Sequence, residues 1–328
     1  MNHLETIHCI TLPTPFAVGD VNLYLIEGEK LTLVDTGPKT PEAWQSFQSQ
    51  LNALGFKPGD IDQVILTHHH PDHVGLADYL KEDKIPFICL EYNLPWLKKD
   101  PDFFAHHDQF YFTVYKEMGI EKFHKKAMER VRGYLDYSCT IEVDQIVKEG
   151  DGIAGLPGWY IIETPGHAQG HLSLIREEDG LMIGGDHLIK HISSNALIEP
   201  PPTGNTARPK TLLQYRESLR KLIEHDVKKV LAGHGEPVEH PVELVQLRLL
   251  KQEERADDIL KIISKESMTG FEICQKLFPT IFLKELGLTM SETLGHLDLL
   301  MSKDQVTIHQ VDGVLYFRAK EVITNECK

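Results

Sequence analysis

The feature that most constrains this chain is a run of histidines directly after an apolar strand. Residues 64–66 read Val-Ile-Leu, which predicts a short buried strand, and residues 67–73 continue as Thr-His-His-His-Pro-Asp-His. In extended backbone, residues two apart point to the same side, so His68 and His70 can bind one metal ion while His69 faces away. Burying unpaired polar groups costs free energy, so such a run has little structural use. The strand is therefore expected to end at a site.

The next residues of the run extend the set of potential ligands. Pro71 disfavours helical backbone at His70, which preserves the alternation. Asp72 and His73 lie where the chain turns into a helix, and they can bind a second metal ion beside the first. Neutral imidazole and carboxylate suit Zn²⁺, and Fe and Mn are compatible with the same donors.

The first part of the chain alternates strand-like and helix-like segments, which predicts an α/β protein. Loops rich in Gly, His and Asp follow the later strands, and functional residues in α/β enzymes commonly occupy such loops. The predicted strands cover residues 21–25, 31–34, 64–66, 159–162, 172–175, 181–183 and 230–231, and helices are predicted at 41–54 and from 75 to about 80.

A segment at about 97–136 departs from this alternation. Its pattern predicts helices, and it is rich in aromatic residues. One interpretation is an amphipathic insertion that packs on the body of the protein. The other is a cap over an active site, with its aromatic side chains lining a substrate pocket. The side chains in question are Phe103, Phe104, His106, His107, Phe110, Tyr111, Phe112 and Tyr115.

The last part of the chain, residues 246–328, has a different character. Helices are predicted around 259–263, at 271–278 and at 291–301, followed by strands at 306–310 and 314–318 around an Asp-Gly turn. Three helices and a hairpin resemble a winged-helix domain. A DNA reader would place basic side chains on the third helix, but residues 291–301 contain no Lys or Arg. We therefore expect a packing or dimerisation module, which makes a homo-oligomer possible.

Charge and composition exclude several classes of function. The 328 residues contain 34 Lys+Arg and 49 Asp+Glu, a net charge of −15, which disfavours bare nucleic acid and anionic membranes as partners. No apolar stretch approaches the roughly 20 residues of a transmembrane helix, and no secretory signal is visible. The five cysteines are scattered, as is typical of reduced thiols. We expect a cytoplasmic protein that acts on a small-molecule substrate.

The pattern His68-x-His70-x-Asp72-His73 resembles the HxHxDH motif of the metallo-β-lactamase superfamily. Further landmarks follow in the order that this superfamily has them, and the resemblance covers roughly residues 7–240. They are Asp35 in Leu-Val-Asp-Thr-Gly, His167 in Thr-Pro-Gly-His, Asp186 in Gly-Gly-Asp and His234 in Gly-His-Gly.

The resemblance implies a four-layer αββα sandwich over residues 1–245, with a helical insertion at about 97–136 and a small winged-helix-like α+β domain at 246–328. It implies two divalent metal ions, with Zn²⁺ preferred over Fe or Mn. His68, His70 and His167 would bind the first ion, and Asp72, His73 and His234 the second. Asp186 would bridge the two, and Asp35 would orient a ligand histidine. Ala168 departs from the Thr or Ser that many relatives carry after the third histidine.

The same resemblance implies hydrolysis by a hydroxide shared between the two metal ions, with Asp72 and Asp186 as the catalytic carboxylates. A sandwich with a winged-helix-like tail resembles the lactamase-beta-like branch, whose members are associated with ester or thioester hydrolysis and with RNA cleavage. Our leading hypothesis is hydrolysis of a small ester, thioester or lactone. The alternatives are a ribonuclease and a non-catalytic metal-binding module. Arg208 and Tyr215 are candidate substrate contacts, because they follow a Pro/Gly loop after Asp186.

Overall fold

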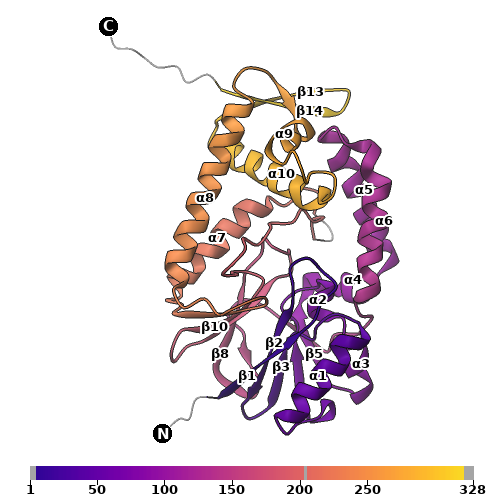
Figure 1. The fold of residues 1–328 in the computed structure, drawn as a ribbon, viewed down its shortest axis with the longest axis vertical. Helices are drawn as coiled ribbons and strands as arrows, with labels where there is room; N and C mark the ends of the chain where they lie inside the picture. Colours follow the sequence, from indigo (N-terminus) through magenta and orange to yellow (C-terminus); the bar gives the residue numbers. More distant parts are fainter. Residues whose placement is uncertain (1–4, 203–204, 321–328) are drawn as a thin grey trace.

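The computed structural model describes residues 5–202 and 205–320, and two β-sheets lie against each other in its lower half (Figure 1). The first sheet has the order β1 (Thr6–Leu12), β2 (Val21–Glu27), β3 (Leu31–Val34), β4 (Gln63–Ile65), β5 (Phe87–Leu90), β6 (Gln145–Val147). The second has the order β11 (Lys229–Ala232), β10 (Leu181–Gly185), β9 (Leu172–Arg176), β8 (Leu156–Glu163), β7 (Gly152–Ile153).

Helices cover the outer face of each sheet, which gives four layers. On the first sheet lies α1 (Pro41–Ala53), and on the second lie α7 (Thr211–Glu224) and α8 (Pro241–Ile262). The position of strand β2 between two layers explains why its sequence is almost wholly apolar. Its residues Leu23 and Leu25 pack towards α1, whereas Tyr24 and Ile26 pack between the sheets. Both faces of the strand are therefore buried, and the expected αββα sandwich is confirmed.

The direction of the strands decides where the loops gather. Strands β3, β4 and β5 run parallel to one another. Strands β8, β10 and β11 also share one direction, because β9 is antiparallel to both β8 and β10, and β10 is parallel to β11. The loops that leave β3, β4, β8, β10 and β11 meet at one edge of the sandwich. The histidine run follows β4 there and enters two short helices, α2 (Pro71–Val74) and α3 (Ala77–Leu80).

The expected insertion is helical. After α4 (Leu94–Leu97), Asp100 caps α5 (Pro101–Glu117) by accepting hydrogen bonds from the first backbone amides, and α6 (His124–Tyr134) follows. These helices run along one side of the molecule from the sandwich to the C-terminal helices (Figure 1). The amide of Phe271 donates to the carbonyl of Met118, so the insertion contacts the C-terminal part directly.

The C-terminal part contains α9 (Gly270–Leu277), α10 (Leu286–Ser302) and a three-stranded sheet of β12 (Met268–Thr269), β14 (Val314–Ala319) and β13 (Val306–Val311). The hairpin predicted at Asp312 and Gly313 is present, and both residues have positive φ, as its tight turn requires. The helix predicted at 291–301 begins earlier, at Leu286, and Thr269 forms a capping box with Glu272 at the start of α9.

The boundary that we expected at 245/246 falls inside helix α8, which continues without interruption from the sandwich into the C-terminal part. One hydrophobic cluster also spans this boundary, because Leu294 and Leu297 of α10 belong to the same core as Leu212 and Leu219 of α7. The two helices approach closely at Gly295, where a side chain would come within 2.8 Å of Leu212. The C-terminal part thus shares a hydrophobic core with the outer helical layer of the sandwich.

Composition predicted reduced cysteines and no transmembrane helix. Cys9, Cys89, Cys139 and Cys274 are free thiols, and Cys327 lies outside the described residues, as does most of the N-terminal segment in which we saw no secretory signal. None of the helices in residues 5–202 and 205–320 combines the length and the apolar character that crossing a membrane requires.

A buried ion pair joins the C-terminal part to the loop before α7. Arg208 donates two hydrogen bonds of 2.7 Å to Asp298 of α10, whose side chain has no exposed surface. We predict that Arg208→Ala lowers the free energy of unfolding by about 3 kcal/mol, because it leaves a buried carboxylate without its cation. Urea unfolding measures the change. The control is Arg220→Ala, which removes an exposed ion pair with Glu217 and should change stability by less than about 1 kcal/mol. Equal effects of both changes would contradict the prediction.

Candidate metal centre

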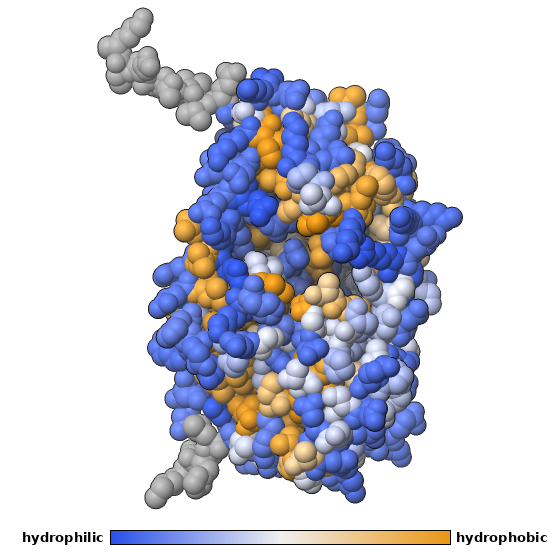
Figure 2. All heavy atoms as spheres, in the orientation of Figure 1, coloured by the Kyte–Doolittle hydropathy of each residue, from blue (hydrophilic) through white to orange (hydrophobic). Residues whose placement is uncertain are grey.

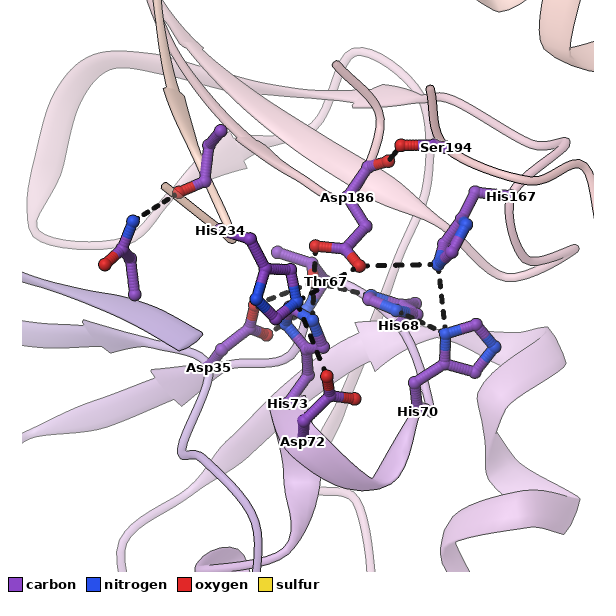
Figure 3. Close-up of polar contacts among 12 residues, drawn as sticks. Asp35, Thr67, His68, His70, Asp72, His73, His167, Asp186, Ser194 and His234 are labelled. Carbon is purple, nitrogen blue, oxygen red and sulfur yellow. Dashed lines mark hydrogen bonds and ion pairs between the residues drawn. The ribbon is translucent and has the colours of Figure 1, made fainter. Parts of the chain in front are cut away.

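The strand ends bring the predicted ligands together in one cluster at the edge of the sandwich (Figure 3). The loop after β4 supplies His68 and His70, helix α2 supplies Asp72 and His73, and the loops after β8, β10 and β11 supply one ligand each. Groups of side chains close enough to share a metal ion contain all seven predicted ligands: His68, His70, Asp72, His73, His167, Asp186 and His234.

The first donor group consists of three imidazoles. Nε2 of His68 lies 2.9 Å from Nδ1 of His70, and the same Nδ1 lies 3.0 Å from Nε2 of His167. The predicted alternation along the strand is confirmed, since His68 and His70 point into the cluster. The ring of His69 lies elsewhere, stacked on Trp96 at 4.2 Å between centroids. Three nitrogens that converge in this way can share a single cation.

The second donor group contains Asp72, His73 and His234. Oδ2 of Asp72 lies 3.4 Å from Nε2 of His234. Asp186 lies between the groups, because its Oδ2 is 3.4 Å from Nε2 of His234 and 3.5 Å from Nε2 of His167. Its other oxygen is 3.3 Å from Nε2 of His73. One carboxylate can therefore contact a cation in either group.

Backbone carbonyls determine which ring nitrogen of two ligand histidines is free. Nδ1 of His167 donates to the carbonyl oxygen of Asn195 at 2.9 Å, and Nδ1 of His234 donates to that of Asp20 at 2.7 Å. A carbonyl oxygen only accepts, so the proton of each neutral ring is on Nδ1. Both Nε2 lone pairs consequently face the cluster, which is the arrangement that metal-binding histidines require.

Asp35 orients two further ligand histidines, His73 directly and His68 through Thr67. Its Oδ2 accepts from Nδ1 of His73 and from Oγ1 of Thr67, both at 2.8 Å, and its Oδ1 accepts from the amide of Thr67. Because Thr67 gives its hydroxyl proton to Asp35, the hydroxyl oxygen accepts from Nδ1 of His68 at 2.9 Å. Asp35 sits in left-handed backbone with a φ of 62°, which Asp tolerates better than most residues. The structure thus places Asp35 where we expected it, behind the ligands.

The electrostatics of the two groups differ. Burial lowers the pKa of His68 and His70 well below its ordinary value, an effect that neighbouring imidazoles strengthen, and burial also lowers the pKa of His167. For His234, burial acts in the same direction, but Asp186 outweighs it and raises the pKa to about 10. The first group is therefore neutral with free lone pairs, whereas the second holds a proton that a cation would replace.

Unpaired polar atoms test whether a metal fits. Nε2 of His73, Nε2 of His234 and Oδ1 of Asp186 are buried and form no hydrogen bond. Buried polar groups in folded proteins almost always have a partner, so these atoms need one. Imidazole nitrogen and carboxylate oxygen are suitable ligands for Zn²⁺ and similar divalent cations. The residues present fit a pair of such ions.

Comparison with known sequences gives the family. Residues 17–234 match the family described as Metallo-beta-lactamase superfamily. The chain belongs to the metallo-β-lactamase superfamily. It is 42% identical over 314 residues to the probable metallo-hydrolase YqjP of Bacillus subtilis, covering 96% of this chain and 98% of that protein. It is 24% identical over 268 residues to a beta-lactamase-like protein 2 homolog of Caenorhabditis elegans, covering 81% of this chain and 73% of that protein.

Solved structures of the superfamily share the fold. The metallo-beta-lactamase family protein TTHA1429 of Thermus thermophilus matches with a TM-score of 0.81 and 23% identity, over 96% of this chain and 98% of that one. A beta-lactamase domain protein from Burkholderia ambifaria matches with a TM-score of 0.77 and 22% identity, over 96% and 92%. Superfamily membership and the donor cluster confirm the expectation of a metal-dependent hydrolase.

The structure corrects both candidate substrate contacts. Arg208 is held by Asp298, and Tyr215 is buried, with its hydroxyl donating to the carbonyl oxygen of His187 at 2.7 Å. Neither lines the cavity beside the cluster. Tyr215 instead packs against Gly166, where a side chain would come within 2.4 Å of its Cβ, so it supports the loop that carries His167. Their place in the sequence after Asp186 therefore does not bring either side chain to the cavity.

Two further histidines contribute to the site without having been predicted. His69 Nε2 lies 3.3 Å from Oε1 of Glu199, and both residues are buried. His171 Nε2 accepts a hydrogen bond from the amide of Asp186, which fixes the backbone of the bridging residue. His69 stands inside the histidine run, and His171 follows His167 by four residues. Glu199 carries no local signal, because only the fold brings it to the cluster.

Asp35 allows a test of how far the cluster depends on its support. We predict that Asp35→Asn weakens metal binding by about 10- to 100-fold, because an amide cannot accept from both Thr67 and His73 as a carboxylate does. Competition with a chelator measures the affinity. The matched control is Asp62→Asn, which changes an exposed carboxylate that accepts from the amide of Leu31. Unchanged affinity in Asp35→Asn would contradict the proposed orientation of the ligands.

The raised pKa of His234 predicts how the metal-free protein responds to pH. A group whose pKa is higher in the folded state stabilises the fold below its unfolded pKa of about 6.5, and this contribution is lost as pH rises through about 10. The free energy of unfolding in a chelator should therefore fall between about pH 6.5 and 10. Added metal should reverse the trend, because metal binding displaces protons.

Urea unfolding across that range measures the slope. His234→Asn should reduce it, while the control His106→Asn, on the exposed face of α5, should leave it unchanged. A free energy that is constant or rises with pH in the metal-free protein would show that the second donor group does not hold a proton.

Proposed function

We propose that this protein is a hydrolase that cleaves a small carboxylic ester, thioester or lactone at a centre of two divalent metal ions. The observation that carries the proposal is the complete donor set. All seven ligand side chains are present, and Asp186 lies within 3.5 Å of nitrogens from both groups. The donor types favour Zn²⁺ and are compatible with Fe or Mn.

We assign the ligands as the geometry groups them. His68, His70 and His167 would hold the first ion, and Asp72, His73 and His234 would hold the second. Asp186 lies near nitrogens of both groups and would be available to either ion. Bound divalent cations in such a pair polarise the carbonyl of a substrate and make water a nucleophile near neutral pH.

The chain's own residues supply orientation and proton handling. Asp72 lies at the start of α2, on the side of the cluster that His234 faces, where its carboxylate can orient an attacking water. During hydrolysis the water oxygen joins the acyl carbon, the bond to the leaving oxygen or sulfur breaks, and the leaving group takes a proton. Asp35, together with Thr67, holds His68 and His73, and the carbonyls of Asn195 and Asp20 hold His167 and His234. These four rings do not have to reorganise as charge develops.

Charge disfavours the ribonuclease alternative. Glu199 is buried beside His69 on the wall of the cavity that also contains His70. A polyanionic substrate would have to approach this carboxylate in a protein part that already carries a large excess of acidic residues. A small neutral acyl compound meets no such penalty.

We also propose that residues 246–328 form a winged-helix-like packing module, since the hairpin follows the helices and α10 packs on α7.

A substrate panel tests the proposal. We expect the metal-loaded protein to hydrolyse members of a set of esters, thioesters and lactones, and Asp186→Asn to lower kcat/KM by about 10³-fold, because it removes the carboxylate shared by both groups. The control Asp226→Asn changes an exposed turn residue and should leave kcat/KM unchanged. If the protein retains metal but cleaves only RNA, the proposal is wrong. If it retains no metal after reconstitution, the ligand assignment is wrong as well.

A further inference from the structure

A cavity of about 390 Å³ opens directly beside the metal cluster, with His70 and Pro71 in its wall. This volume lies within the range of ligand pockets, about 300 to 1,000 Å³. Most of its walls come from the insertion and the C-terminal part, which are far apart in sequence. The lining is mainly apolar and aromatic and includes Trp96, Tyr111, Ala127, Val131, Leu286 and Leu288.

The end of the cavity near the metals has a built polar wall. His69 is stacked on Trp96 and paired with Glu199, and the second oxygen of Glu199 accepts from the amide of Gln169 at 2.7 Å. The hydroxyl of Tyr111 donates to the carbonyl oxygen of Ile198. These side chains are held in place by their own partners, so the wall keeps its shape when the cavity is empty.

The walls from α6 and the start of α10 carry apolar side chains together with the charged Lys126, Arg130 and Glu285. Ala127 and Val131 of α6 face Leu286 and Leu288 at the start of α10. Arg130 of α6 forms an ion pair of 3.1 Å with Glu285 and thereby ties the two walls together. In Figure 2, hydrophobic residues gather below the C-terminal part beside a hollow in this face. Unfilled apolar space of this kind favours an apolar occupant.

We propose that this cavity binds the acyl group of the substrate, and that the substrate is an ester or thioester of an apolar carboxylic acid. The inference rests on the proposed hydrolase function. The acyl carbonyl lies at the His70 end, and the chain extends between α6 and α10. The C-terminal part thus determines which acyl length is accepted, a role distinct from packing or dimerisation.

A series of para-nitrophenyl esters tests acyl recognition. From acetate to octanoate, kcat/KM should rise by about fourfold per added methylene until the cavity is filled. Ala127→Phe fills the cavity and should lower kcat/KM for the octanoyl ester by about tenfold or more while sparing the acetyl ester. Leu288→Trp should act in the same way from the other wall. The control Glu129→Phe adds the same ring to the exposed face of α6, outside the cavity.

Calorimetric titration with octanoate, the product acid, gives a readout that does not need turnover. We expect octanoate to bind the wild-type and Glu129→Phe proteins and to bind Ala127→Phe at least tenfold more weakly. If esters are hydrolysed but neither kcat/KM nor octanoate binding responds to acyl length or to Ala127→Phe, the acyl site is wrong while the hydrolase function stands. If no ester is hydrolysed but octanoate binds in this pattern, the proposed function fails and the apolar binding site stands. Absence of both overturns both.

Discussion

The structure depends on the convergence of buried imidazole and carboxylate groups at the edge of two facing sheets. Without a cation, these groups leave lone pairs pointed at one another and buried atoms without partners, which costs free energy. That cost can be sustained only because the surrounding sandwich holds each loop at a strand end, and hydrogen bonds on the outer side hold the rings of His68, His73, His167 and His234. The cluster is therefore pre-organised for divalent cations, and metal binding and stability are coupled through it.

Asp35 is the central support of this arrangement. One carboxylate accepts from the amide and hydroxyl of Thr67 and from His73, and so fixes the orientation of ligands in both donor groups. His167 and His234 are oriented by backbone carbonyls of distant loops. The site is consequently rigid in the part that binds metal, whereas the insertion and the C-terminal part line the cavity beside it.

The C-terminal part is joined to the sandwich and also lines the cavity. Helix α8 leads into it without a break, and α10 shares a hydrophobic core with α7 of the sandwich. Its sequence resembles a small winged-helix domain, yet residues at the start of α10 line the cavity beside His70. A segment whose sequence resembles an independent domain thereby contributes to the acyl-binding site that we propose.

Much of the site could be predicted because its signals are local. The alternation of His68 and His70 follows from short-range backbone geometry. The landmarks at the strand ends carry the family resemblance, which implied the sandwich and the seven side chains that the structure brings together. Arg208 and Tyr215 were predicted from their place in the sequence after the Pro/Gly loop. In the structure Arg208 forms an ion pair with Asp298, and the hydroxyl of Tyr215 is buried and donates to the carbonyl of His187. Glu199 and the cavity had no local signal, because they exist only where the insertion, the sandwich and α10 meet. Local sequence thus specified which atoms can bind metal, whereas the packing of distant elements specified what can lie beside them, since a pocket is the space left between segments far apart in the chain.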